Sequence, residues 1–180
     1  YNPEFLREKH AYEDFINSNL IVFGGNIESS KKLAEIYLKY TKCVNKDYIF
    51  TDLVTASLLK YAINTFLASK VIFFNEFHDL FNAVDTNESW TNFVNYLSRD
   101  TRLGDSHMDV PGHDGRFGFG GACLPKDAYA ITKYADKINV EMSLIKHAIN
   151  INNKIRASYE DVTDREEQQN IKYNIEEVKK

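Results

Sequence analysis

A long stretch without helix-breaking residues constrains this chain most. No glycine or proline occurs from residue 26 to residue 103. Within that window, Thr51 or Asp52 can cap a helix whose apolar residues continue to Phe81. About 32 residues at ~1.5 Å each give a helix roughly 48 Å long. Because apolar side chains cover more than one stripe of it, this helix needs neighbours on several sides, and a second subunit is the simplest supplier. The alternative is the buried central helix of a monomer.

Two short apolar segments that precede the long helix predict a βαβ unit. Residues 20–23 form a compact apolar run that ends at a Gly-Gly pair, and residues 48–50 form a second one. Between them, Ser29 or Ser30 can cap a helix that runs to about Tyr40. Its buried face is expected to carry Leu33, Ile36 and Tyr37. A helical crossover between two strands makes them parallel.

The second half of the chain is predicted to be helical around one long loop. A helix over 88–97, capped by Asn87, precedes a loop over 98–121, and helices over 124–137 and 140–157 follow it. The loop holds six of the eight glycines, and loops of this length are usually functional or disordered. The expected fold class is therefore mainly α (α+β), with a long central helix, a helical bundle and a small βαβ unit.

The end of the glycine-rich loop carries the strongest chemical signal. Three glycines within residues 118–121 let the backbone turn tightly and approach a ligand. Cys123 follows, and Pro125 favours the first turn of a helix. Unpaired N–H groups at a helix N-terminus favour a thiolate, and Asp127 is placed on the same face. We therefore expect Cys123 to be a nucleophile, and Cys43, which lacks such a setting, to be an inert core residue.

Composition excludes several classes of function. A net charge of −4 gives no basic footprint for nucleic acid. The two cysteines suggest neither a disulfide framework nor a metal cluster, and His107 and His113 lack metal-ligand spacing. No apolar run approaches the roughly 20 residues of a membrane span, and no signal peptide is visible. We expect a cytoplasmic protein without a membrane or nucleic-acid partner.

Three motifs in order resemble one enzyme family. Residues 2–8 (NPEFLRE) resemble its NPEFL-x-E motif, residues 60–64 (KYAIN) its K-x-x-x-N motif, and residues 118–127 (GFGGACLPKD) its catalytic-cysteine motif. The family is the UDP-glucose/GDP-mannose dehydrogenases, which oxidise an alcohol of a nucleotide sugar to a carboxylate with NAD. The resemblance covers roughly residues 1–156. It implies NAD as cofactor, a UDP-sugar substrate and a homodimer; the expected sugar is UDP-glucose, with GDP-mannose or UDP-N-acetylmannosamine as alternatives.

The resemblance gives each matched residue an expected role. Cys123 adds to the aldehyde intermediate. Lys60 and Asn64, one helical turn apart, steady the oxyanion, and Lys60 also transfers protons. Asp127 positions water or pairs with Lys60, and Glu4 acts in thioester hydrolysis. The residues expected at the sugar nucleotide are Glu4, Phe5, Leu6, Arg7, Glu8, Lys60, Asn64, Arg102, Phe117, Gly118, Phe119 and Gly120. Those expected at the cofactor are Glu8, Cys123 and Lys126.

Ordinary structural roles are the alternatives for these residues. Lys60 can be a solvated helix lysine, Asp127 an acid that favours the helix dipole, and Glu4 a surface acid. Arg102 resembles the arginine that the family sends across the dimer interface, although the gap from it to Cys123 is longer than the family pattern. The backbone amides of residues 114–120 are then expected to hold the substrate.

The resemblance also divides the chain. Residues 1–51 are expected to be the C-terminal part of an NAD-binding Rossmann-like domain, and residues 52–157 the central dimerisation and catalytic domain. Residues 158–180 form a tail with 11 charged residues out of 23, expected to wrap the surface or to be disordered. Because the chain opens inside a motif without a methionine, we expect a partial chain. A non-catalytic dimerisation core, inactive by itself, is the alternative function.

Overall fold

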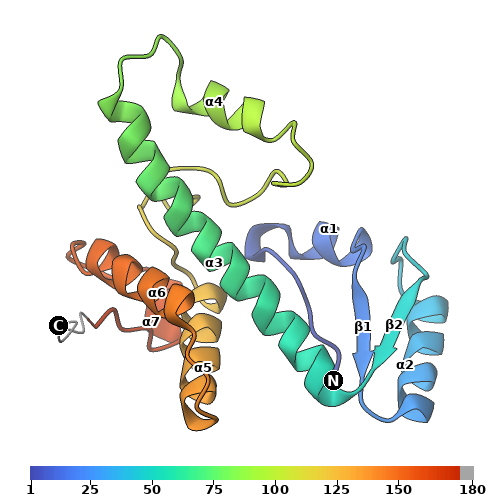
Figure 1. Cartoon of the computed structure of the whole chain (residues 1–180). Coiled ribbons are helices and arrows are strands. Elements are labelled where there is room, and N and C mark those ends of the chain that lie inside the picture. The colour runs from blue at the N-terminus through green and yellow to red at the C-terminus, as the bar shows by residue number, and fades with distance from the viewer. Residues whose placement is uncertain (175–180) are drawn as a thin grey trace. The chain divides into compact units, whose positions relative to one another are not determined.

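The computed structural model describes residues 1–174, which form two compact units (Figure 1). The first unit is Tyr1–Ile63, and the second begins at Asn64. The sequence places a domain boundary after residue 51 instead, where the long helix begins. The units divide inside that helix, so one element contributes side chains to both.

A parallel strand pair organises the first unit, as the sequence predicts. Strand β1 (Ile21–Gly24) pairs with β2 (Tyr48–Thr51), with Ile21 opposite Tyr48 and Gly24 opposite Thr51. Helix α2 (Ile27–Tyr40) makes the crossover between them. Its N-cap is Asn26, whose side chain accepts a hydrogen bond from the Ser29 amide, so neither Ser29 nor Ser30 is the cap.

The core of the first unit lies between β1 and α2. Its buried residues are Ile21, Phe23, Ala34 and Cys43. Leu33 and Tyr37 of α2 pack against this core, whereas Ile36 is 51% exposed. The buried face of α2 is therefore narrower than expected, because Ala34 rather than Ile36 faces the strands. The burial of Cys43 agrees with its expected role as a core residue.

The N-terminal segment lies along β1. Asn2 donates to the carbonyl of Val22 at 2.8 Å and accepts a hydrogen bond from the Tyr37 hydroxyl at 2.5 Å. A short 3₁₀ helix, η1 (Glu8–His10), and helix α1 (Ala11–Ile16) follow. These contacts fix the start of residues 2–8 against the strand pair.

Helix α3 (Leu53–Ala83) is the longest element of the chain (Figure 1). Its 31 residues match the predicted helix closely. The Asp52 carboxylate accepts hydrogen bonds from the amides of Val54 and Thr55 at 2.8 and 2.9 Å, which is the capping that the sequence predicts.

By length and composition, α3 could also cross a membrane, although its sequence contains no uninterrupted apolar run of that length. One such helix is weak evidence, since the core helix of a globular domain passes the same test. Polar side chains in the second-unit part of α3 bond to the loop that follows α4. Lys70 donates to the carbonyls of Leu103 and Ser106, and Asn75 accepts a hydrogen bond from the amide of Gly118. These bonds indicate packing inside a protein.

In the second unit, α4 (Trp90–Leu97) packs along the end of α3 through aromatic rings. Phe77 stacks on Phe93 with centroids 5.8 Å apart, and Trp90 meets Phe81 at 5.5 Å. Ser89 caps α4 by accepting from the Asn92 amide. The predicted cap Asn87 is wrong by two residues, because several polar residues precede the first apolar one.

Helices α5 (Cys123–Lys137) and α6 (Ser143–Arg156) pack on each other and on the middle of α3. Their shared core contains Ala68, Ile72, Phe119 and Ala148. The glycine-rich loop supplies Phe119 to it, so the loop is packed into the unit.

The described part of the tail contains a short helix, so of the two expectations, a surface-wrapping or a disordered segment, it fits the first. Thr163 caps a short helix, α7 (Asp164–Gln168), through a reciprocal capping box with Glu166. Glu166 is 0% exposed. The tail therefore inserts an acid into the second unit, and its remaining residues, 175–180, lie outside the described part.

Candidate functional site

Cys123 is the first residue of α5, as the motif predicts, and its side chain is exposed. The residue before it, Ala122, has helical backbone angles and offers no side-chain cap. The thiol thus lies at a helix N-terminus whose first amides have no capping side chain, where anions are favoured. This is an accessible position for a nucleophile, whereas Cys43 is 2% exposed.

The central carboxylate of the site is Asp127, which is 3% exposed. Asn64 Nδ2 donates to Asp127 Oδ2 at 2.5 Å, and Lys126 Nζ lies 2.6 Å from Asp127 Oδ1. Asn64 is itself 6% exposed. The second unit therefore joins two motifs far apart in sequence, the K-x-x-x-N helix and the cysteine helix, at one buried hydrogen bond.

Lys60 is held by the first motif, within the first unit. Its ammonium group donates to the backbone carbonyl of Glu4 and lies over the ring of Phe5, 5.4 Å from the centroid. The interaction ties the NPEFL segment to α3. It also shows that Lys60 has protein partners, which disfavours the alternative of a freely solvated helix lysine.

The rest of the first motif forms local structure. Arg7 makes a bidentate ion pair with Asp14: Nη2 lies 2.7 Å from Oδ1 and Nε 3.0 Å from Oδ2. The Arg7 side chain is nevertheless 62% exposed. The pKa of Asp14 is lowered by this hydrogen bond to Arg7, against the raising effect of burial. Glu8 begins η1, Glu4 is exposed, and Leu6 is half-buried.

The amides of the glycine-rich loop are used inside the protein. Phe117 N donates to Tyr159 Oη at 2.9 Å, Gly118 N to Asn75 Oδ1 at 2.9 Å, and Phe119 N to Asn152 Oδ1 at 2.7 Å. The expectation that these amides bind substrate therefore needs correction for residues 117–119. These amides fix the loop against α3, α6 and Tyr159 of the tail instead.

The glycines in this loop serve close packing as well as turning. Gly118 has a φ of 74°. A Cβ on Gly118 would lie 2.5 Å from Asn152 Oδ1, and one on Gly120 would lie 2.6 Å from both Arg156 Cζ and Glu166 Oε1. Gly121 has nothing within 4 Å of such a Cβ, so of the three glycines in residues 118–121 it alone has the open space beside it that a ligand would need.

Arg102 lies at the surface of the second unit, 87% exposed at its side chain, and pairs with Asp100 at 2.5 Å. The buried Lys70 anchors the following residues through the carbonyls of Leu103 and Ser106. Burial lowers the pKa of Lys70, and the nearby charge of Asp105 raises it in part. The loop that carries Arg102 is thus fixed while the guanidinium group faces outward.

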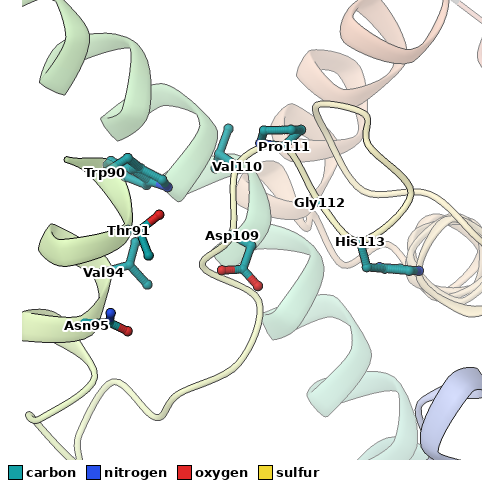
Figure 2. Close-up of a pocket in the computed structure, with 9 residues that line it drawn as sticks. All are labelled: Trp90, Thr91, Val94, Asn95, Asp109, Val110, Pro111, Gly112 and His113. Carbon is teal, nitrogen blue, oxygen red and sulfur yellow. The ribbon is translucent and has the colours of Figure 1, made fainter.

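A pocket of about 320 Å³ lies between α4 and residues 109–113 (Figure 2). Trp90 and Asn95 line it from the helix, and Asp109 and His113 from the loop. Trp90 Nε1 is buried, with no hydrogen-bond partner among the described residues. None of the predicted site residues lines this pocket, so it is separate from the chemistry assigned to Cys123.

Sequence reasoning missed four residues that hold the loop: Asn75, Asn152, Arg156 and Glu166. The clue that could identify such residues is a polar side chain at a helix position that is buried. Asn75 follows Phe73 and Phe74, and Asn152 follows Ile151; buried polar groups need partners.

Comparisons with known proteins agree with the motifs. The model of the UDP-glucose/GDP-mannose dehydrogenase family, central domain, matches residues 54–154. A UDP-glucose 6-dehydrogenase of Rickettsia felis is 37% identical over 156 residues, covering 84% of this chain and 32% of the relative. One from Rhizobium meliloti is 34% identical over 160 residues, covering 87% of this chain and 35% of the relative.

A solved structure is also similar. The UDP-glucose dehydrogenase of the hyperthermophilic archaeon Pyrobaculum islandicum superposes with a TM-score of 0.69 at 33% identity, over 85% of this chain and 33% of that one. The chain thus spans about a third of the length of the relatives it matches.

Proposed function

The chain belongs to the UDP-glucose/GDP-mannose dehydrogenase family, and from this premise we propose that its parent protein is an NAD-dependent UDP-glucose 6-dehydrogenase. The product is UDP-glucuronate. The observation that carries the proposal is the accessible Cys123 at the start of α5, next to the buried pair of Asn64 and Asp127. Dehydrogenases for GDP-mannose or UDP-N-acetylmannosamine are the alternatives within the family.

The reaction removes two hydrides and adds one water. The first oxidation converts the C6 alcohol to an aldehyde. The Cys123 thiolate then adds to the aldehyde carbon, the resulting hemithioacetal loses the second hydride to become a thioester, and water cleaves the thioester and frees the thiol. Covalent capture keeps the aldehyde from escaping. The exposed Sγ of Cys123 suits attack on a substrate arriving from solvent.

Two NAD molecules, bound in turn, would each accept one hydride. Glu8, Cys123 and Lys126 are the residues proposed to face the cofactor. Lys126 is 54% exposed at its side chain although it pairs with Asp127, so its charge remains accessible to an anionic cofactor. Residues 1–51 are proposed as the end of the domain that binds the rest of NAD, and their parallel βαβ unit fits such a domain.

We propose that three residues stabilise the oxyanion and transfer protons during the reaction: Lys60, Asn64 and Asp127. One N–H of Asn64 bonds to Asp127, and an amide nitrogen carries a second N–H that can donate to an oxyanion. One such donor contributes about 3 kcal/mol to stabilisation of a transition state. Lys60 adds positive charge, Asp127 orients water, and Glu4 serves as acid and base in thioester hydrolysis.

The sugar nucleotide is proposed to contact both motifs and the loop. Phe5, Leu6, Arg7 and Glu8 follow Glu4 in the first unit, and Phe117, Gly118, Phe119 and Gly120 precede Cys123 in the second. Because the amides of residues 117–119 are already bonded, this loop offers shape and carbonyl groups more than free amides.

We propose a homodimer built on α3, in the cytoplasm. Three exposed residues, Phe66, Phe73 and Leu80, recur every seven residues in its second half, as in a helix seam that packs on a partner. Arg102 would reach the sugar nucleotide of the partner, which suits its outward position. The second candidate function follows from this stripe: the chain by itself is a non-catalytic dimerisation core.

A single assay tests the enzyme proposal. The whole protein that contains this chain is mixed with UDP-glucose and NAD, and NADH is followed by absorbance, with two NADH expected for each UDP-glucuronate. Cys123→Ala should abolish turnover, and Cys43→Ala should retain it. NADH formation that survives Cys123→Ala would contradict the mechanism. UDP-N-acetylmannosamine and GDP-mannose, run in parallel, decide the sugar.

A further inference from the structure

Arg156 is the centre of a buried polar network, formed by Asp114, Arg156, Glu166 and Tyr173 and called here the arginine network. Arg156 Nη1 donates to Asp114 Oδ2 at 2.6 Å and lies 3.6 Å from Glu166 Oε1. The Tyr173 hydroxyl donates to Glu166. Arg156 is 4% exposed and Glu166 0%. The network therefore joins the loop, α6 and the tail, with Arg156 and Glu166 buried and Asp114 and Tyr173 half-buried.

The arginine network holds the last four residues of the glycine-rich loop, 118–121. Arg156 Nη2 donates to the carbonyl of Gly118 at 2.8 Å. Gly121 N lies 3.3 Å from Glu166 Oε1, to which it donates. Between them, Gly120 packs so closely that a Cβ would overlap Arg156 and Glu166. These contacts of Arg156 and Glu166 fix residues 118–121, which directly precede Ala122 and Cys123.

The two acids of the network stay ionised. Burial raises the pKa of Asp114, but the hydrogen bond and charge of Arg156, the Arg116 amide and the charge of His113 together lower it by more. Burial likewise raises the pKa of Glu166, and the hydrogen bonds of Tyr173 and Thr163 together with the charge of Arg156 outweigh it, so that this pKa is also lowered. Removing Arg156 would leave both acids without their cation, and removing Glu166 would leave Arg156 with Asp114, the other acid of the network. The loss of a buried charge partner usually costs much more than the loss of a surface ion pair.

We propose that Arg156, Glu166 and Tyr173 are positioning residues that hold residues 114–121 in the conformation that presents Cys123 to the sugar nucleotide. None of the three needs to touch the substrate, since each acts through the loop. This inference rests on the proposed function, because that function gives the loop its ligand. It assigns the tail a part in the reaction that its charged composition does not suggest.

Hydrogen exchange measures the positioning effect without any turnover. In Glu166→Gln, amides of residues 114–122 are expected to exchange about tenfold faster than in the unaltered chain, because one anchor is weakened. The matched control is Glu167→Gln, since Glu167 is an exposed acid on the same helix; its loop exchange should stay within about twofold. Unchanged loop exchange in Glu166→Gln would overturn the proposal.

A milder variant guards against loss of the fold. Tyr173→Phe removes one hydroxyl that donates to Glu166, so it should speed exchange in residues 114–122 and leave α4 protected. If Glu166→Gln speeds exchange throughout the second unit, Tyr173→Phe decides: a change confined to the loop supports the proposal, and no change in the loop overturns it.

Kinetics of the whole protein separate positioning from general stability. Tyr173→Phe is expected to raise KM for UDP-glucose about tenfold and to leave KM for NAD within about twofold. Equal changes in both constants, or none, would overturn the proposal. If the unaltered protein forms no NADH at all, the proposed function fails, and the exchange experiment still judges whether the network holds the loop.

Discussion

Two cysteines in this chain differ only in their surroundings. Cys43 Sγ lies 3.5 Å from the carbonyl of Phe15 in the first core, and Cys123 stands exposed at the start of α5. Access and a helix N-terminus favour reaction of the second thiol, while burial slows reaction of the first. The chemistry assigned to Cys123 therefore depends on its position.

A thiol titration tests this difference on the chain itself. With a disulfide reagent that reports released thiolate, the folded chain should show one fast-reacting thiol, and denaturant should reveal the second. Cys123→Ala should show none until it is unfolded. Two fast thiols in the folded chain, or a fast thiol that persists in Cys123→Ala, would show that the assignment of access is wrong.

Residues within local motifs were predictable, and residues that act over long separations were not. Cys123 and Asp127 lie four positions apart, so sequence spacing alone places them on one helix. Asn152 and Glu166 meet the glycine-rich loop from 33 and 45 residues away, and no local pattern records such a contact. The buried pair of Asn64 and Asp127 lies between these cases: family resemblance gave each residue a catalytic role, but it paired Asp127 with water or Lys60 and not with Asn64.

Among the elements, the glycine-rich loop shows how conformation and space impose separate demands. Gly115 and Gly118 both have a φ of 74°. A Cβ on Gly115 would meet nothing within 4 Å, whereas one on Gly118 would lie 2.5 Å from Asn152 Oδ1. A larger residue would therefore be strained in its backbone at both positions, but only at Gly118 would it also clash with a neighbouring side chain.

Alanine substitutions at these two glycines separate the effects. Gly115→Ala should lower the free energy of unfolding by about 1 kcal/mol, through left-handed strain alone. Gly118→Ala should lower it by about 3 kcal/mol, because overpacking adds to the strain. Urea unfolding measures both. Equal losses would mean that Asn152 moves aside without cost.

Element identity was easier to predict than element ends. The period of apolar residues located β1, α2, β2 and α3. The predicted N-cap residues of α2 and α4 were wrong: the caps are Asn26 and Ser89. Neighbouring polar residues are equally suitable as caps, so the sequence does not distinguish between them. Helix α7 escaped prediction because its stability comes from Glu166, buried against distant partners, rather than from an apolar stripe.

At the scale of the whole molecule, the exposed stripe of α3 leads to a prediction about assembly. Phe73→Glu places a charge at the middle of Phe66, Phe73 and Leu80, so a dimer of the unaltered chain should become a monomer. Leu144→Glu is the control, since Leu144 of α6 is even more exposed, at 73%, and lies off the stripe. Sedimentation velocity decides; a dimer that survives Phe73→Glu excludes this seam.

Acid should weaken the second unit through its buried acids. The pKa of Glu166 is lowered from 4.5, so its contribution to stability is complete above that value and is lost as pH falls through the lower, folded pKa. The gap in unfolding free energy between the unaltered chain and Glu166→Gln should therefore narrow from about pH 7 to about pH 3. Urea titrations at both pH values measure it, and a constant gap would contradict the assignment.

Trp90, the only tryptophan of the chain, has a practical consequence. It lies in the second unit, edge-on to His78 at 5.0 Å and beside Phe81 and Phe93, while the aromatic residues of the first unit are tyrosines and phenylalanines. Indole emission, excited selectively, therefore gives a built-in optical label for the half of the molecule that holds Cys123. Comparing its signal with that of far-ultraviolet dichroism would reveal whether the two halves melt together.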